Sequence, residues 1–173
     1  ASDYAEYFEW ADRNPNNEDR TGMTVSLSGD KIKIAETGDD VLGVVSAMPG
    51  VIGDAKEMEW QGKFQRDEFG RFIMESYYYF EWIDDQGTIQ TEPNYGDLTR
   101  VPENAVRKDT DGAGNPLLRP KYNPDYDPSI IYIPRSQRQE WAAVGLLGKL
   151  RVLKGQVISG NWKKLKDINE IIE

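Results

Sequence analysis

Short apolar runs separated by turn residues constrain the fold of this chain more than any other feature. Its 173 residues include 16 glycines and 9 prolines, which fall between apolar runs of only a few residues. Glycine reaches backbone conformations closed to other residues and proline lacks a backbone donor, so both mark turns. Short strands fit this spacing and long helices do not. The sequence therefore predicts a mainly β fold built from antiparallel sheet.

Two segments near the N-terminus alternate apolar and polar residues, as half-buried strands do. They span residues 23–27 and 31–35, and the turn residues Gly29 and Asp30 lie between them. This arrangement predicts a β-hairpin. Residues 41–47 form a short continuous apolar run, which predicts a strand buried on both faces.

An aromatic block predicts a second hairpin. Residues 71–83 are rich in aromatic and β-branched side chains, and a turn at residues 84–87 separates them from the strand-like residues 88–91. Successive strand side chains face opposite sides, which gives two sets: Tyr77, Tyr79 and Glu81, and Tyr78, Phe80 and Trp82. We expect one face to lie in the core and the other to form a subunit interface or, alternatively, a carbohydrate platform.

The rest of the chain predicts an excursion, a strand pair and a helix. Residues 93–134 are rich in Pro, Asn and Asp, which favours a long excursion with few strands. Residues 141–153 are apolar again and predict two paired strands, with Gly145 and Gly148 in close backbone contacts. Helical spacing predicts a short C-terminal helix over residues 162–173, with apolar residues Trp162, Leu165, Ile168 and Ile172.

The length suits one domain over residues 1–173, because a chain of this size can bury about 70% of its unfolded surface. No apolar run approaches the roughly 20 residues of a membrane span, and the acidic first residues do not resemble a signal peptide. We therefore expect a soluble protein. The chain begins without methionine, so we also expect a fragment or processed product of a longer chain.

The amino-acid composition excludes several kinds of partner, metal site and catalytic mechanism. The 30 acidic and 21 basic side chains give a net charge of −9, which argues against nucleic acid or an anionic membrane as partner. Cysteine and histidine are both absent. Disulfides, thiolate and imidazole metal sites, cysteine nucleophiles and the Ser-His-Asp triad are therefore impossible. Any catalysis must use carboxylates, lysine, tyrosine or hydroxyl groups.

Two motifs are set aside. Residues 145–149 read GLLGK, but they lack the spacer and the final Ser or Thr of a phosphate-binding loop. The acidic pairs also lack the spacing of a calcium loop, so we predict solvated turns and no metal; these pairs are Asp39 and Asp40, Asp84 and Asp85, and Asp109 and Asp111.

The opening segment carries the most specific signal. Residues 3–10 read DYAEYFEW, and residues 14–20 read NPNNEDR. This string resembles the start of the intramolecular-chaperone (IMC) autoproteolytic domain at the C-terminus of phage pre-neck appendage and tail-spike proteins, a glutamic-type peptidase family. Four later stretches fit the same family, and they are LGVVS at 42–46, PGVIG at 49–53, DEFGR at 67–71 and WAAVGLLGK at 141–149.

The resemblance implies a homotrimeric domain that helps three β-helical tail-spike chains assemble in the host cytoplasm and then cuts itself off. The family's cut corresponds to the Ser2–Asp3 bond here, within a cleavage-site segment of residues 1–14, and its proposed catalytic residue corresponds to Glu6. The expected partners are two further copies and the upstream β-helical body. ATP is implied at the release step, at residues that the resemblance does not identify.

Two carboxylates suffice for this cut, and two routes remain open. The Asp3 carboxylate reaches the Ser2 carbonyl through a six-membered ring and could form a mixed anhydride, or Glu6 could act as general base on water while Asp3 assists the leaving amine. The Ser2 hydroxyl is excluded, because attack on its own carbonyl would close a four-membered ring. A basic side chain from a neighbouring chain or a distant loop, with Arg13, Arg71 and Arg100 as candidates, is expected to stabilise the oxyanion.

A rival interpretation comes from a different functional class. The chain would then be a non-cleaving structural cap or receptor-binding tip of a tail fibre, with the aromatic block at residues 77–82 as its contact surface. Visible self-cleavage favours the first hypothesis, whereas binding to a saccharide array favours the second.

Overall fold

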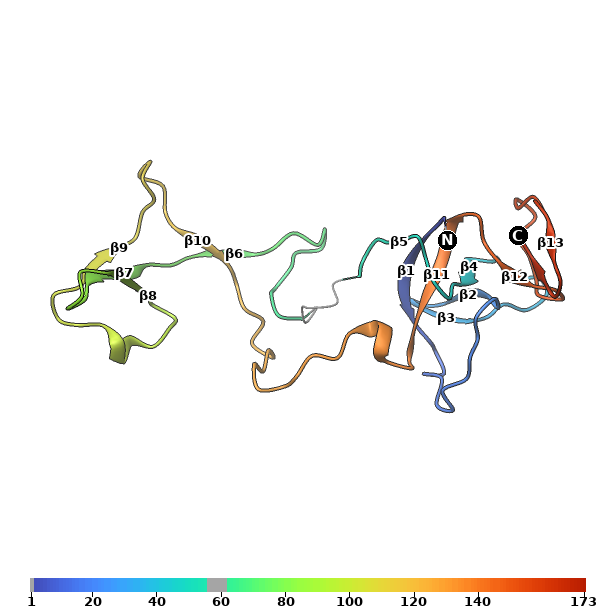
Figure 1. The fold of residues 1–173 in the computed structure, drawn as a ribbon, viewed down its shortest axis with the longest axis horizontal. Coiled ribbons are helices and arrows are strands. Elements are labelled where there is room, and N and C mark those ends of the chain that lie inside the picture. The colour runs from blue at the N-terminus through green and yellow to red at the C-terminus, as the bar shows by residue number, and fades with distance from the viewer. Residues whose placement is uncertain (1, 56–61) are drawn as a thin grey trace. The chain divides into compact units, whose positions relative to one another are not determined.

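The computed structural model describes residues 2–55 and 62–173 and confirms a mainly β fold (Figure 1). The chain divides into two compact units. The first comprises Ala1–Trp60 and Ile131–Glu173, and the second comprises Gln61–Ile130. The second unit is therefore an insertion in the sequence of the first. That residues 1–173 function as a single domain stays a prediction.

A six-stranded sheet organises the first unit. Its order is β3-β2-β4-β11-β1-β5, and only β1 and β5 pair in parallel. The strands are β1 (Asp3–Glu9), β2 (Thr24–Ser28), β3 (Lys31–Ile34), β4 (Gly43–Val45), β5 (Val51–Ile52) and β11 (Trp141–Gly148). The N-terminal hairpin is thus confirmed as β2 and β3, and the buried strand as β4, whose three residues are all buried.

One cluster of buried apolar side chains lies in the first unit. It consists of Trp10, Val25, Ile32, Val45, Ala142 and Val144, and other apolar residues such as Ala5 and Val44 are buried as well. Strand alternation sends every second residue of β2 and β11 inward, which explains why residues far apart in sequence meet here. β1 is the chain's N-terminal strand, and it lies between β11 and β5, so the start of the chain is fixed on both sides.

Two predictions at the C-terminal end are wrong. Residues 162–173 form no helix; they contain β13 (Asp167–Ile168) and β14 (Ile171–Ile172), which pair with each other, while β12 (Val152–Leu153) pairs with β14. Asn169 adopts a left-handed φ of 52° between β13 and β14, and a helix of this length is marginal by itself. Residues 141–153 are likewise not a strand pair, since β11 pairs with β1 and β4 instead.

The second unit contains two small sheets. One has the order β8-β7-β9 and the other joins β10 to β6. The strands are β6 (Met74–Ser76), β7 (Tyr79–Ile83), β8 (Ile89–Pro93), β9 (Val106–Lys108) and β10 (Leu118–Pro120). The aromatic hairpin is confirmed as β7 and β8. The predicted excursion over residues 93–134 holds β9, β10 and one 3-10 turn, η1 (Leu98–Arg100), and a second 3-10 turn, η2 (Arg135–Gln137), follows it.

The prediction that one face of the aromatic block lies in a core is wrong. No residue of β7 is buried, and Glu92 is the single buried residue among residues 62–130. The rings pack instead on each other and on cations: Tyr78 meets Phe80 edge-on, and the Arg107 guanidinium lies 3.7 Å from the Tyr78 ring centroid. Such contacts can stabilise aromatic side chains without burying them in a core.

No helix in the described part of the chain has the length and apolar character that crossing a membrane requires.

Candidate functional site

The Asp3 carboxylate is fixed at the first position of β1. Its Oδ2 accepts a hydrogen bond of 2.7 Å from the Ser46 hydroxyl, and its Oδ1 accepts one of 3.2 Å from the Gly50 amide. Asp3 is only 6% exposed. A buried carboxylate needs such donors, because an unpaired one is costly to desolvate. The side chain next to the predicted scissile bond is therefore held in one orientation.

Two glycines of β11 make room for this junction. Gly148 pairs with Asp3 and adopts a φ of +100°; a Cβ there would lie 2.5 Å from the Ser2 carbonyl oxygen and 3.0 Å from the Asp3 Cα. A Cβ on Gly145 would lie 3.0 Å from Asp3 Oδ2. The prediction of close backbone contacts at these glycines is confirmed. The backbone of β11 thus lies directly against the predicted scissile carbonyl.

The pairing of β1 with β11 is irregular beside the junction. Tyr4 pairs with Leu147 and Ala5 with Gly145, so Leu146 is an extra residue in β11. Bulges of this kind re-aim side chains and occur often next to active sites. The pairing of Leu147 and Gly148 with β1 is therefore offset by one residue from the pairing of the rest of β11.

Glu6 does not share the environment of Asp3. Residues 3 and 6 of a strand face opposite sides, and the burial of β1 alternates accordingly, with Asp3, Ala5 and Tyr7 buried. Glu6 Oε1 instead accepts a hydrogen bond of 2.7 Å from the Tyr4 hydroxyl. This hydrogen bond raises the pKa of Tyr4 above its ordinary value of 10.0. The structure therefore does not bring the two carboxylates of one chain together, and their catalytic roles stay predictions.

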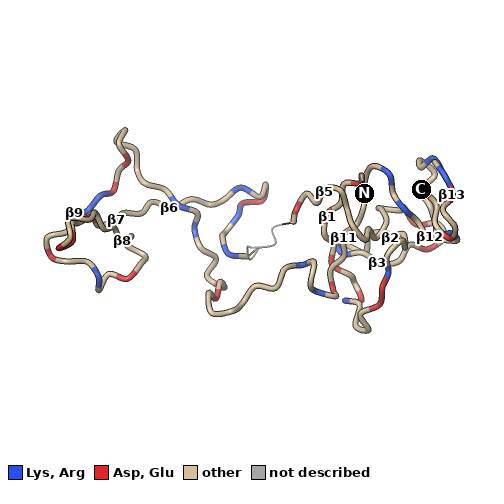
Figure 2. The backbone as a smooth tube through the Cα atoms, in the orientation of Figure 1, with Lys and Arg blue, Asp and Glu red and all other residues tan. Residues whose placement is uncertain are grey.

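A cavity of about 670 Å³ opens beside the junction, within the first unit. Three of its lining residues, Ser2, Asp3 and Ser46, belong to the junction itself. Apart from Asp3, its charged lining residues come from the C-terminal part of the chain, and they are Lys149, Arg151, Lys166 and Glu173. In Figure 2 these stretches of the first unit carry the blue of Lys and Arg. The cavity therefore places charged side chains around the Ser2–Asp3 junction.

None of the three arginines predicted as oxyanion support lies at this junction within the first unit. Arg13 is exposed in the turn after β1, at the end of the strand remote from Ser2. Arg71 and Arg100 belong to the second unit, where Arg71 binds Asp67 at 2.7 Å and Arg100 contacts Glu92. Two of the candidates are thus already paired with carboxylates, and their predicted role stays untested.

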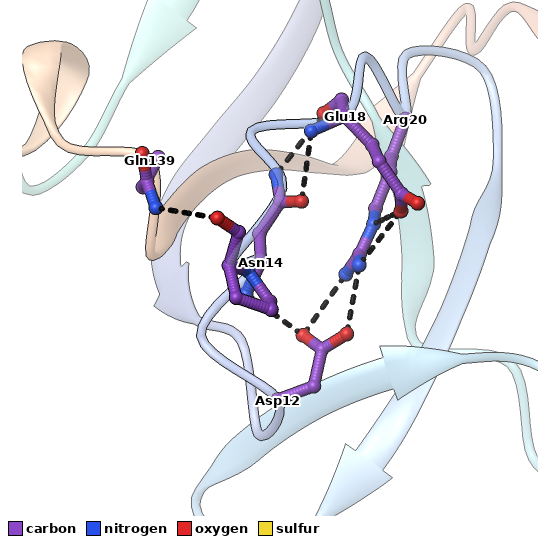
Figure 3. Close-up of polar contacts among 6 residues, drawn as sticks. Asp12, Asn14, Glu18, Arg20 and Gln139 are labelled. Carbon is purple, nitrogen blue, oxygen red and sulfur yellow. Dashed lines mark hydrogen bonds and ion pairs between the residues drawn. The ribbon is translucent and has the colours of Figure 1, made fainter.

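The NPNNEDR string of the opening motif builds a structural loop (Figure 3). The Arg20 guanidinium donates to both oxygens of Asp12 at 3.0 and 2.7 Å and also binds Glu18, while it lies 4.5 Å from the Trp10 ring centroid. Asn14, which is 4% exposed, exchanges two hydrogen bonds with the Glu18 backbone. This part of the motif fixes the end of β1 opposite the junction.

The Asp12–Arg20 pair predicts a specific acid response. Hydrogen bonding to Arg20, helped by the Asn14 amide, lowers the pKa of Asp12 from 3.8 to about 2. The folded carboxylate binds its proton less readily than the unfolded one, so its stabilisation is complete above pH 3.8 and disappears as the pH falls to about 2. Because Asp12 is 56% exposed, we expect its contribution to stay below about 1 kcal/mol.

This response can be measured against an Asp12→Asn variant. The difference in free energy of unfolding between the two proteins should be constant near neutral pH and shrink between pH 4 and pH 2, and NMR should place the Asp12 titration near pH 2. A titration midpoint near 4 would contradict the pairing.

The acidic pairs organise turns, and residues 145–149 form no phosphate loop. Asp84 Oδ1 accepts from two backbone amides of its turn, and Asp111 Oδ1 does the same. Residues 145–148 are part of the extended strand β11. Among residues 2–55 and 62–173, no group of three acidic side chains is placed to hold a metal ion.

Sequence reasoning missed Ser46 and Gly50 as partners of Asp3. Both lie in or beside stretches that carry the resemblance, residues 42–46 and 49–53. A serine and a glycine that follow a buried strand are the sequence signal for Ser46 and Gly50. Neither residue type is distinctive by itself.

Comparison with known proteins shows the family to which the chain belongs. The family described as "Peptidase_G2, IMC autoproteolytic cleavage domain" matches residues 1–171. The preneck appendage proteins of Bacillus phages PZA and phi29 are each 36% identical over 151 residues, which cover 87% of this chain and 14% of each relative. The putative phage-related protein YobO of Bacillus subtilis strain 168 is 34% identical over 148 residues, 84% of this chain and 14% of the relative.

Two solved structures share the fold. The crystal structure of the pre-mature bacteriophage phi29 gene product 12 has a TM-score of 0.57 at 34% identity, over 88% of this chain and 15% of that chain. The crystal structure of the C-terminal fragment of phi29 gene product 12 has a TM-score of 0.53 at 34% identity, over 87% of this chain and 71% of that one. With a family match that spans nearly its whole length, the chain belongs to the IMC autoproteolytic cleavage domains, Peptidase_G2.

Proposed function

We propose that this chain is the C-terminal intramolecular chaperone of a phage or prophage appendage protein and that it releases itself by cutting the Ser2–Asp3 bond. The observation that carries the proposal is the packed junction, where Gly148 lies against the Ser2 carbonyl while Ser46 and Gly50 hold Asp3. A peptide bond held in one geometry beside a water-accessible cavity gains rate from positioning alone. Each chain needs to cut only once.

The placement of Glu6 supports a site shared between copies. Three residues of extended strand span about 10 Å, and Asp3 and Glu6 face opposite sides of β1. A Glu6 carboxylate acting at the Ser2 carbonyl therefore fits best when it comes from a neighbouring copy. This requirement would delay the cut until the chains have assembled.

The chemistry balances with one water and two carboxyl groups. Water adds to the Ser2 carbonyl carbon and gives its proton to the Glu6 carboxylate of the neighbouring copy. The carbon–nitrogen bond then breaks and the amine of Asp3 leaves with that proton. The second proton of the water then passes from the new carboxyl group to the amine, which leaves a carboxylate on Ser2 and an ammonium group on Asp3. The Asp3 side chain stays hydrogen-bonded to Ser46 and Gly50 and orients the leaving amine. Catalysis by a glutamate of this kind is the glutamic-type mechanism.

The second unit supports assembly as a homotrimer. Among its described residues no apolar side chain is buried, and several large ones are more than half exposed, including Phe69, Ile83, Ile89, Val106 and Leu118. A unit of this size needs a core or a partner to be stable. Contacts with the same unit of two further copies would supply that burial. The upstream β-helical body would be the other partner.

ATP is not used in this mechanism. Two of the cations lining the junction cavity, Arg151 and Lys166, are both paired with Glu173. A triphosphate would have to displace Glu173 from both, so the residues present at this cavity do not fit it. A role of ATP in release stays an expectation from the family.

Intact-mass analysis of a longer natural chain tests the proposal. A chain carrying about fifty upstream residues should yield a fragment that begins at Asp3, and sedimentation should show trimers before the cut appears. An Asp3→Asn variant gives an uncut reference of the same length. A chain that forms trimers and stays intact would contradict self-cleavage and favour the structural tip of a tail fibre.

A further inference from the structure

The junction cavity contains one basic side chain that is not neutralised. Of its three cations, Arg151 and Lys166 each lie 3.3 Å from an oxygen of Glu173. The Glu173 side chain is only 9% exposed, so its negative charge offsets the positive charges of Arg151 and Lys166. Lys149 makes no ion pair within the part of the chain that the structure describes. It is the cation of this cavity whose charge remains available.

The backbone places Lys149 next to the scissile carbonyl. Lys149 follows Gly148, which pairs with Asp3. Gly148 lies so close to Ser2 that a Cβ on Gly148 would overlap with the Ser2 carbonyl oxygen. The flexible four-carbon stem of a lysine can carry its ammonium group several ångströms from the backbone. Ser2 and Lys149 line the same cavity. The length of the lysine stem therefore allows the ammonium group to approach the Ser2 carbonyl oxygen from within this cavity.

We propose that Lys149 stabilises the negative charge that develops on the Ser2 carbonyl oxygen during cleavage. This inference rests on the proposed self-cleavage at Ser2–Asp3. When water adds to the carbonyl carbon, the electrons of the double bond move to the oxygen, and a fixed positive charge lowers the energy of that state. The lysine neither gains nor loses a proton, and its bonds do not change.

The exposure of Lys149 limits the size of the effect. Its side chain is exposed, and solvent screens a charge in that position more than one in a closed oxyanion hole. We therefore expect a contribution of about tenfold in rate, below the hundredfold or more that a buried donor supplies.

The test follows the rate of self-cleavage in the chain with its upstream residues. Lys149→Gln should slow the cut about tenfold, and Lys149→Arg should restore most of the rate because it keeps the charge. Lys163→Gln is the matched control, since Lys163 is an exposed lysine of the same unit that does not line the junction cavity. Thermal unfolding and sedimentation of all variants report folding and assembly.

Each outcome decides the inference. A slow Lys149→Gln that assembles normally, with rescue by arginine, supports it. Equal rates for Lys149→Gln and the unaltered chain overturn it while leaving self-cleavage intact, and so does a slow Lys149→Arg, because charge would then not be the property that matters. Absence of any cut at Ser2–Asp3 in the unaltered chain overturns the proposed function together with this inference.

Discussion

Replacing Gly148 with alanine should slow self-cleavage at Ser2–Asp3 by about a hundredfold or more. The new Cβ would lie 2.5 Å from the Ser2 carbonyl oxygen and 3.0 Å from the Asp3 Cα. Neither atom is the end of a flexible side chain, so the backbone at the junction must move. A displacement of about 1 Å at a reacting centre costs on the order of a hundredfold in rate. Mass analysis over time in the chain with its upstream residues measures the loss.

Gly155→Ala separates this effect from backbone strain. Gly155 also has a left-handed φ, +88°, but a Cβ there would meet nothing within 4 Å. Alanine costs about 1–2 kcal/mol of strain at either position, and only Gly148→Ala disturbs the junction. Equal slowing in both variants would show that lost stability, rather than contact with the carbonyl, causes the effect.

The local fold was largely predictable where the pattern is short and regular. The hairpin of β2 and β3 follows from alternation around Gly29 and Asp30, and β4 follows from a continuous apolar run. These signals depend on residues close in sequence. The helix expected over residues 162–173 failed because apolar residues three or four apart also occur in short strands, and Asn169 reverses the chain between β13 and β14.

The site was predictable only in part. The resemblance indicated Ser2, Asp3 and Glu6, and the structure adds how each is held. The partners of Asp3 depend on long-range pairing: Ser46 lies 43 residues away and Gly50 lies 47 residues away. Nothing in the GLLGK string points to Lys149 as a partner of the junction, because its place next to Ser2 depends on the register of β1 and β11. No local pattern encodes that register.

Mixed trimers should show that Glu6 acts on a neighbouring chain. Glu6→Gln alone should reduce cleavage by roughly a hundredfold to ten-thousandfold, as expected for loss of a general base. Asp3 and Glu6 face opposite sides of β1, so the chain that is cut and the chain that supplies Glu6 would differ. In a closed ring of three, one particular neighbour would supply Glu6 to each junction. When Glu6→Gln and Asp3→Asn chains assemble in equal amounts, about half of the Glu6→Gln chains would therefore receive an intact Glu6.

The experiment requires the two chains to differ in upstream length, so that mass identifies which one is cut. Cleavage should return in the Glu6→Gln chains, which retain Asp3 at their own junction, and should stay low in the Asp3→Asn chains. Trimers of Glu6→Gln alone are the control. If neither chain is cut in mixed trimers, Glu6 acts within its own chain, and β1 must then rearrange, since three extended residues separate the two carboxylates and place them on opposite faces. Recovery in the mixture would instead make the cut depend on assembly, because a single chain would then lack the base that its own junction requires.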